Sequence, residues 1–296
     1  MKISIITLAY NNNKCLADFL DSIKKFNDIG DELEIIIVDH NLPENSALGT
    51  LRTHGTGKCI YVTQDNRAGL CGGDNLGASL ASGEILAFMN QDILLIEPVF
   101  GKAIEKFSIN PNLGWLGGKI LEEDGSDSCS YAYRFEYRTL YRPSFKWQSL
   151  KYNLFDERTM FLWGCGTFMR RKVFDLIGGY DENFLFCNEE ADLVRKIHTF
   201  ATGYTVEYHP DIRMVHLGGR SDLPAPQGDR IALDDLLYYC KKYNLDYRRY
   251  LLQEYKDELE RLEEEKIHRP ENVPERRKLV AYLRELVINE YNLGAD

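Results

Sequence analysis

The sequence predicts an α/β fold with a Rossmann-like, mixed but mostly parallel sheet flanked by helices. Apolar, β-rich runs such as residues 3–9 and 34–38 alternate with segments whose apolar residues recur every three or four positions, as between residues 16 and 26. A chain of 296 residues that is 44% hydrophobic can bury one large core or two joined halves. Sheets of this kind bind ligands at the carboxyl ends of their strands, so the functional site is expected there.

The first ninety residues contain four expected strands, at 3–9, 34–38, 59–63 and 84–89. Three asparagines after the first strand offer N-cap chemistry to a helix with a single apolar stripe. The glycine-rich segment 66–77 is expected to be a loop that runs into a short helix ending near Ser82. Its glycines permit close backbone approach, which suits either contact with a phosphate or tight-turn packing.

The second half of the chain is less regular. Residues 123–160 are rich in Tyr, Arg and Ser, and we expect long loops there with one hairpin and a surface that faces substrate. A strand is expected at 164–171, a helical turn at 173–177 and an acidic helix from about 188. Prolines then precede two long helical stretches, at 230–266 and 275–291.

Composition excludes several classes of protein. A net charge of -10 provides no positive field for nucleic acid. The seven cysteines form no Cys-x-x-Cys pair, so reduced thiols are expected instead of a zinc site. No run of about 18 apolar residues could span a membrane, and the initial apolar run is too short for a signal peptide. We therefore expect a cytoplasmic protein, with peripheral contact at the inner membrane face left open.

Polar residues that follow the strands are candidates for chemistry, and each has a purely structural alternative. Asp39 ends the second strand, where it would accept a hydrogen bond from a base or ribose, or cap the following loop. Asn90 and Asp92 share one side of an extended chain, and an Asn with an Asp suits a ribose and a divalent cation. The alternative for Asp92 is an ordinary acid at a strand end.

Three carboxylates crowd the expected start of the acidic helix. Glu189, Glu190 and Asp192 would either meet the helix dipole or, beside the apolar residues 184–186, raise one another's pKa as a general base requires. His216 follows another apolar run and precedes two glycines. It is interpreted as either a metal ligand or a structural hydrogen-bonding residue.

In this order, these motifs resemble the family 2 glycosyltransferases of the GT-A fold, and especially bacterial rhamnosyltransferase-like members. The resemblance covers roughly residues 3–222 and rests on residues 7–11, 37–39, 66–77, 89–92, 178–184, 189–193 and 216–221. Each fragment alone is weak. Because the fragments occur in the family's order over more than 200 residues, we favour the functional interpretation of each over its structural alternative.

The resemblance implies an inverting transfer of sugar from a nucleoside diphosphate sugar to a hydroxyl of a glycan or lipid-linked saccharide, in cell-surface polysaccharide synthesis. It implies a divalent cation, Mn²⁺ or Mg²⁺, held by Asp92 and His216. Glu190 stands at the position of the general base, with Asp192 as the alternative. The residues implied in donor binding are Thr7, Ala9, Tyr10, Asp39, Asn66, Gly69, Asn75, Asn90 and Gln91.

Two departures from the family pattern motivate an alternative function. Asn90 replaces the first acid of the metal motif and Glu190 replaces the usual Asp. A non-catalytic sugar-nucleotide-binding or scaffold protein with a degenerate site is therefore the main alternative. A nucleotidyltransferase is disfavoured, because residues 10–13 stand where that class needs a basic, glycine-rich loop.

The resemblance also suggests the domain organisation. Residues 1–222 would form the GT-A domain, with a nucleotide-binding half at 1–93 and an acceptor half at 94–222. Residues 223–296 would form a C-terminal helical extension. Its interleaved Tyr and basic residues at 238–250 suit a membrane interface or, alternatively, a solvated helix with core-facing tyrosines. The acidic stretch 254–266 is expected to face water, and the oligomeric state is left open.

Overall fold

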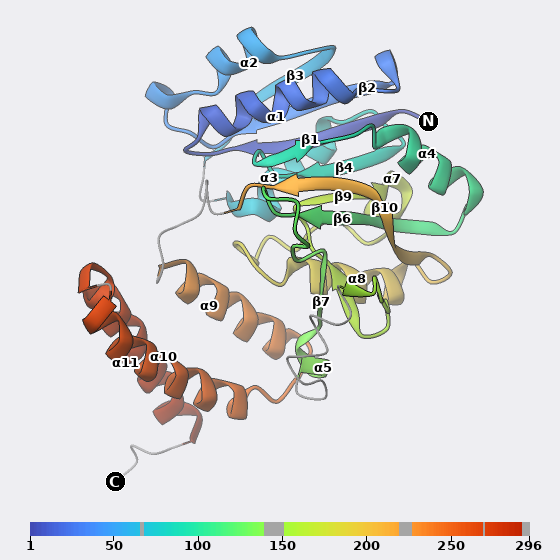
Figure 1. Cartoon of the computed structure of the whole chain (residues 1–296). Helices are drawn as coiled ribbons and strands as arrows, with labels where there is room; N and C mark the ends of the chain where they lie inside the picture. The colour runs from blue at the N-terminus through green and yellow to red at the C-terminus, as the bar shows by residue number, and fades with distance from the viewer. Residues whose placement is uncertain (66–67, 139–150, 219–226, 269, 292–296) are drawn as a thin grey trace. The chain divides into compact units, whose positions relative to one another are not determined.

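The computed structural model describes residues 1–65, 68–138, 151–218, 227–268 and 270–291 (Figure 1). The chain divides into two compact units. The first unit comprises residues 1–185 and 189–221, and the second, helical unit comprises residues 186–188 and 222–296. Each unit is described by itself.

The first unit is built on an eight-stranded sheet with the order β3-β2-β1-β4-β9-β6-β10-β5. Strands β3, β2, β1 and β4 are parallel to one another, and β6 is parallel to β10. Strand β9 runs antiparallel to both of its neighbours, and β5 runs antiparallel to β10. The predicted mixed, mostly parallel sheet is confirmed. The strands are β1 (Ile3–Ala9), β2 (Leu33–Asp39), β3 (Lys58–Thr63), β4 (Ile85–Met89), β5 (Ile93–Leu95), β6 (Leu113–Leu121), β9 (Gly166–Arg170) and β10 (Thr205–His216).

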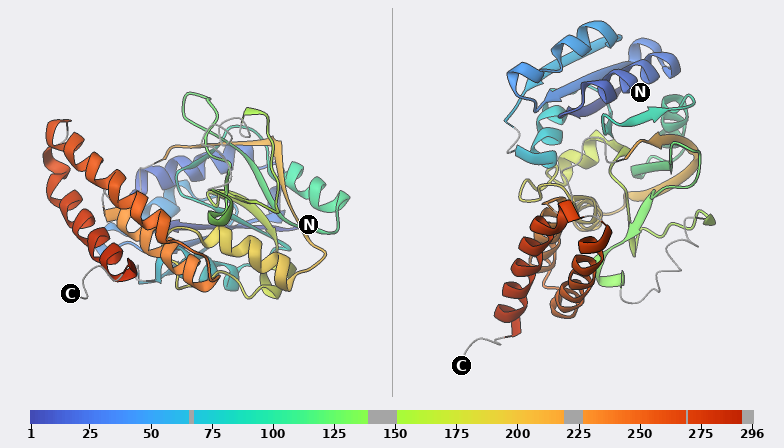
Figure 2. Two further views of the ribbon diagram at one scale, coloured as in Figure 1. Left: turned by 90° about the horizontal axis from the view of Figure 1, so that it is seen from below. Right: turned by 60° about the vertical axis from the view of Figure 1, so that its left-hand side comes forward.

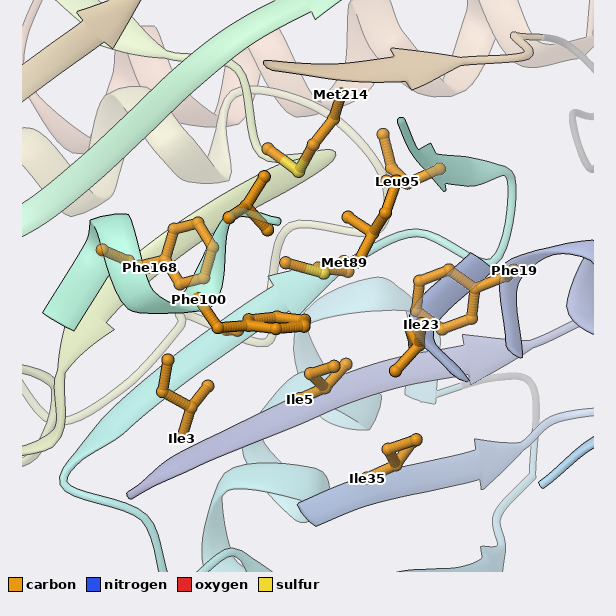
Figure 3. Packing of buried hydrophobic residues seen from close by; sticks show 14 of the residues in the cluster. Ile3, Ile5, Phe19, Ile23, Ile35, Met89, Leu95, Phe100, Phe168 and Met214 are labelled. Carbon is orange, nitrogen blue, oxygen red and sulfur yellow. The ribbon is translucent and has the colours of Figure 1, made fainter. Parts of the chain in front are cut away.

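Helix α1 (Asn13–Phe26) begins where the asparagine cluster predicts, because the Asn12 side chain accepts a hydrogen bond from the Cys15 N–H. Its apolar stripe packs on one face of the sheet together with α4 (Phe100–Ile109). Figure 3 shows this core, whose labelled members include Ile3, Ile5, Phe19, Ile23, Phe100 and Phe168. Burial of this face fixes the register of the central strands, since a one-residue slip would turn every inward side chain outward.

The opposite face of the sheet is covered by α3 (Gly69–Leu80), and here the predicted loop is wrong. Residues 69–77 are helical, and Gly73 and Gly77 lie against β1. A Cβ atom on Gly73 would lie 2.5 Å from Leu8 Cδ2, and one on Gly77 would lie 2.4 Å from Ile6 Cγ2. Gly73 and Gly77 therefore let the backbone of α3 approach the sheet closely. Of the two alternatives, phosphate contact and packing, these two positions show packing, although it occurs in a helix and not in a turn.

The remainder of the first unit contains elements that the sequence pattern indicates only in part. The irregular region includes a small antiparallel sheet of β7 (Tyr131–Tyr133) and β8 (Met160–Leu162). Positive φ angles at Gly178 and Gly179 follow α7. The other helices are α2 (Leu48–His54), α5 (Phe135–Arg138), α7 (Arg171–Leu176), α8 (Glu189–Phe200) and the 3₁₀ turns Gly30–Glu32 and Pro43–Asn45.

The helical unit contains α9 (Gln227–Lys242), α10 (Arg248–His268) and α11 (Val273–Tyr291), with the 3₁₀ turn Pro270–Asn272 before α11. Figure 2 shows α10 and α11 side by side. The predicted single stretch 230–266 is wrong, because the chain turns at Asn244 with φ +51°. The core consists of Leu233, Leu237, Leu251, Leu279, Leu283 and Val287.

Two expectations concern the surface of the helical unit. Tyr247 and Tyr250 pack against its core, in agreement with the core-facing alternative, and membrane contact stays a prediction. The acidic stretch does not face water throughout, because Glu258 is buried and pairs with Arg276 Nη1 at 2.7 Å. Among the residues described, no helix has both the length and the apolar character needed to cross a bilayer.

The fit of α3 on the sheet leads to a stability prediction. Gly77→Ala should lower the free energy of unfolding by about 1–3 kcal/mol, because its Cβ would overlap Ile6. Gly49→Ala in α2 is the matched control. It has no heavy atom within 4 Å of the added Cβ, and should be neutral or stabilising by up to about 1 kcal/mol. Urea unfolding followed by circular dichroism measures both, and equal effects would contradict the packing argument.

Candidate active site

The candidate site lies where the central parallel strands end. Strand β1 ends at Ala9, β2 at Asp39 and β4 at Met89, at the same edge of the sheet. The turn after β4 leads into β5, whose Ile93 pairs with His216 at the end of β10. The topology therefore brings a residue from late in the chain beside the turn after β4.

Asp92 and His216 are in direct contact. Asp92 is 1% exposed, and its Oδ1 lies 3.1 Å from His216 Nε2. Asp92 also accepts a hydrogen bond at its backbone carbonyl from the Leu217 N–H, at 3.0 Å, which holds the two segments together. The structure thus brings together the two predicted metal ligands.

A divalent cation fits this pair only with help from a substrate. Across the described ranges, no cluster of three or more His, Cys, Asp or Glu residues suitable for a metal is present. Asp92 Oδ1 is buried, and no hydrogen bond of good geometry reaches it within the same ranges. A carboxylate oxygen and an imidazole nitrogen suit Mn²⁺ or Mg²⁺ when phosphate and water oxygens complete the coordination.

Glu190 lies in the first turn of α8, and its carboxylate reaches back to the sheet. Its Oε1 accepts a hydrogen bond from the Gly164 N–H at 3.0 Å. A Cβ atom on residue 164 would lie only 2.9 Å from the same oxygen, so the glycine leaves the space that the carboxylate fills. Burial raises the pKa of Glu190 to about 7, although the Gly164 N–H opposes this shift. A carboxylate with this pKa can accept a proton near neutral pH.

The residue after Gly164 connects Glu190 to the turn that carries Asp92. The Cys165 carbonyl accepts a hydrogen bond from the Asn90 N–H at 3.0 Å. Burial raises the pKa of the Cys165 thiol, and the charges of Asp92 and Glu190 raise it further. The Gly164–Cys165 turn therefore contacts Glu190 through the Gly164 N–H and contacts the turn that carries Asp92 through the Cys165 carbonyl.

Asp192, the alternative base, is also buried but faces elsewhere. It lies two residues after Glu190 on α8, and residues two apart on a helix do not share a face. The contact with Gly164 is made by Glu190. The geometry thus favours Glu190 as the base, and its role stays a prediction.

Asp39 is fully engaged by its own chain. Tyr61 Oη donates to Oδ2 at 2.6 Å and the Ala47 N–H donates to the same atom at 2.7 Å. Ser46 and Asn41 add further hydrogen bonds. Burial alone would raise the pKa of Asp39, but these donors hold it below its ordinary value. The structure shows the loop-cap alternative, and contact of Asp39 with a base or ribose stays a prediction.

Gln91 joins the ends of β4 and β1. Its Nε2 donates to the Tyr10 carbonyl at 2.5 Å, and its Oε1 accepts from the Tyr10 N–H at 3.3 Å. Asn90 is half-buried at the same turn, and Ala9 is buried. Thr7 is fully buried, and its hydroxyl has no hydrogen-bond partner in the described part of the chain. The fold thus brings these five predicted donor-site residues to the edge of the sheet where β1 and β4 end.

Asn75 and Gly69 serve the packing of α3. The Asn75 amide donates to the Tyr180 carbonyl at 3.1 Å and to Glu182 at 2.9 Å, while its oxygen accepts from the Tyr180 N–H. Gly69 has φ +65°, and a Cβ there would lie 3.1 Å from the Leu185 carbonyl oxygen. Both residues tie α3 to the segment before α8. Asn66, also predicted in the donor site, lies outside the described residues.

Gly164 and Cys165 are the site residues that sequence reasoning missed. The sequence placed them in a strand, whereas they form a turn before β9. A glycine before an apolar strand gives no local sign that a carboxylate 26 residues later will occupy its missing side-chain volume. Only the contact between α8 and this turn reveals their role.

The buried carboxylate predicts a pH-dependent stability. The folded-state pKa of Glu190 is about 7 against an ordinary 4.5, so wild-type stability should fall as pH rises through this window. Glu190→Gln cannot ionise, and should gain about 3 kcal/mol over wild type at pH 8 but little at pH 4.5. Exposed Glu84→Gln is the control. Urea titrations at both pH values measure the difference, and a gain independent of pH would contradict the burial argument.

Comparisons with known proteins agree with this architecture. Residues 4–178 match the sequence profile described as Glycosyl transferase family 2. The O-antigen biosynthesis protein RfbC of Myxococcus xanthus is 22% identical over 191 residues, which are 62% of this chain but 15% of that protein. This chain therefore spans a small part of that relative.

Solved structures share the fold. A mannosyltransferase, PcManGT of Pyrobaculum calidifontis in complex with GDP-Man and Mn²⁺, has a TM-score of 0.55 at 18% identity, over 74% of this chain and 57% of that one. Residues 1–349 of S. aureus TarS have a TM-score of 0.52 at 16% identity, over 81% of this chain and 72% of that one. The predicted GT-A fold is confirmed, and since the profile match covers more than half of its length, the chain belongs to glycosyl transferase family 2.

Proposed function

We propose that this chain transfers a sugar, with inversion, from a nucleoside diphosphate sugar to a hydroxyl of a glycan or lipid-linked saccharide. The observation that carries the proposal is the placing of Glu190, held by Gly164, in the same region as the Asp92–His216 pair. Family membership supports it. The relative named for O-antigen biosynthesis supports a role in cell-surface polysaccharide synthesis.

Glu190 acts as the general base in this proposal. The acceptor hydroxyl must lose its proton as it attacks the anomeric carbon, and a carboxylate with a pKa near 7 is ionised in about half of the molecules at neutral pH. The Gly164 N–H fixes the orientation of the carboxylate through Oε1. Positioned proton transfer of this kind contributes roughly 10² to 10⁴ in rate.

Asp92 and His216 would hold Mn²⁺ or Mg²⁺ together with the donor diphosphate. The cation would neutralise the charge that develops on the departing nucleoside diphosphate. Asp92 brings one negative charge and His216 binds as a neutral imidazole. Asn90 brings no charge, so the diphosphate supplies the remaining anionic ligands. The complex of PcManGT with GDP-Man and Mn²⁺ supports this arrangement.

The donor nucleoside would lie against the ends of β1 and β2. Gln91 holds the backbone of Tyr10 beside the turn after β4, so the segment from Thr7 to Tyr10 offers a fixed surface. Asp39 contributes by shaping the loop after β2. Asn90 would address the ribose. Asn75 and Gly69 act indirectly, through the position of α3.

Glu190→Gln should lower kcat by roughly 10² to 10⁴ while the donor KM stays nearly unchanged. Nucleoside diphosphate release measures this, with a donor panel of UDP-glucose, UDP-N-acetylglucosamine, GDP-mannose and dTDP-rhamnose plus Mn²⁺. In wild type, kcat/KM should rise about tenfold per pH unit below pH 7 and level off above it.

Asp192→Asn provides the comparison for the base. It should lose less activity than Glu190→Gln. If Glu190→Gln kept wild-type turnover and Asp192→Asn lost it, the assignment of Glu190 as the general base would be overturned. Binding of a donor without any release of nucleoside diphosphate by wild type would instead favour a non-catalytic sugar-nucleotide-binding protein.

Asp92→Asn should abolish the metal-dependent part of donor binding. With the same donor panel, the rise in Tm that Mn²⁺ adds to the donor should disappear, because the amide cannot supply an anionic ligand. Exposed Asp124→Asn is the matched control and should keep the full rise. Activity of wild type that is unchanged in excess chelator would refute the cation site.

A further inference from the structure

Trp163 is an exposed aromatic residue within a buried segment. Its exposed fraction is 38%, whereas Phe161, Leu162 and Cys165 are all at most 3% exposed. The chain therefore leaves a large apolar ring in water directly beside residues that it buries. Ligand sites are commonly lined by aromatic rings that remain accessible to water in this way.

The indole of Trp163 packs against a neighbouring aromatic ring. Its ring lies nearly parallel to that of Phe161, with an interplanar angle of 18° and centroids 6.4 Å apart. The backbone N–H of Trp163 donates to the Ser130 carbonyl at 3.0 Å, which ties the main chain at this residue to the segment before β7. A ligand that stacks on the indole thus meets a ring whose freedom is already reduced, so little entropy is lost on binding.

The position of Trp163 relative to the base follows from chain connectivity. Gly164, the next residue, donates its N–H to Glu190 Oε1 and lies against that carboxylate. Adjacent Cα atoms are about 3.8 Å apart, so the backbone that carries the indole is joined directly to the residue that holds Glu190. An acceptor hydroxyl must approach the base to about 3 Å, and the rest of its sugar ring extends over the neighbouring surface.

We propose that the indole of Trp163 stacks on the sugar ring of the acceptor and holds its hydroxyl at Glu190. This inference rests on the proposed glycosyl transfer and adds the residue that selects a cyclic acceptor. A pyranose presents an apolar face of C–H groups, which suits an aromatic plane, while its hydroxyls stay at the edge for hydrogen bonding. Trp163 is a positioning residue for the acceptor, and the donor does not need it.

Kinetics on Trp163→Ala and Trp163→Phe test the proposal. With the donor that wild type uses from the same panel and methyl pyranosides as acceptors, Trp163→Ala should raise the acceptor KM tenfold or more. Trp163→Phe, which keeps a smaller ring, should raise it no more than threefold. Hydrolysis of the donor without acceptor should stay at the wild-type rate in both. Phe200→Ala is the control, since Phe200 is 63% exposed at the far end of α8.

The outcomes separate this inference from the proposed function. An unchanged acceptor KM in Trp163→Ala, with transfer intact, overturns the role of Trp163 alone. Failure of wild type to turn over any donor refutes the proposed function. In that case, ¹H–¹⁵N spectra of the indole N–H groups still show whether Trp163 binds a sugar. The signal that is missing from the spectrum of Trp163→Phe identifies the Trp163 indole. Methyl pyranosides should shift the Trp163 signal, and an unmoved signal at saturating glycoside contradicts stacking.

Discussion

The hydrogen bond from the Gly164 N–H to Glu190 is the contact on which the rest of the site depends. It joins the first turn of α8 to the turn before β9, two segments 26 residues apart in sequence. The next residue, Cys165, accepts the Asn90 N–H and so extends the connection to the turn that carries Asp92. These two hydrogen bonds connect Glu190 on α8 to the turn that carries Asp92 at the edge of the sheet.

The electrostatics of this region favour a cationic or proton-donating ligand. Asp92 and Glu190 are both nearly excluded from water, and both act on the buried Cys165 thiol. Burying charge is costly unless a partner compensates it. His216 provides a partial partner for Asp92, whereas Glu190 responds by a raised pKa. A site that keeps two poorly compensated carboxylates close together is well suited to a bound cation and to transfer of a proton.

Local sequence predicted those elements whose local signals agree with their tertiary context. Strand β1 and helix α1 have clear periodicity and an Asn cap, and they form where expected. The glycine-rich part of helix α3 was not predicted, because its glycines indicate a loop when taken alone. Their close packing on Ile6 and Leu8 is a tertiary contact that the local pattern does not contain. The order of the motifs predicted that Asp92 and His216 would lie together. It did not predict the hydrogen bonds of Gln91 to Tyr10 or of Ala47 to Asp39, because these depend on contacts between segments that are separate in sequence.

The replacement of Asp by Glu at position 190 has a physical counterpart at position 164. A glutamate is one methylene longer, so its carboxylate needs extra room if the helix keeps its place. Residue 164 supplies that room, since a Cβ there would lie 3.1 Å from Glu190 Cγ and 2.9 Å from Oε1. The longer acid thus occupies the volume that the glycine lacks, and its oxygen accepts the N–H of the same residue. An alanine at position 164 would therefore displace this carboxylate, and an aspartate at position 190 would be one methylene too short to make the same contact from the same backbone.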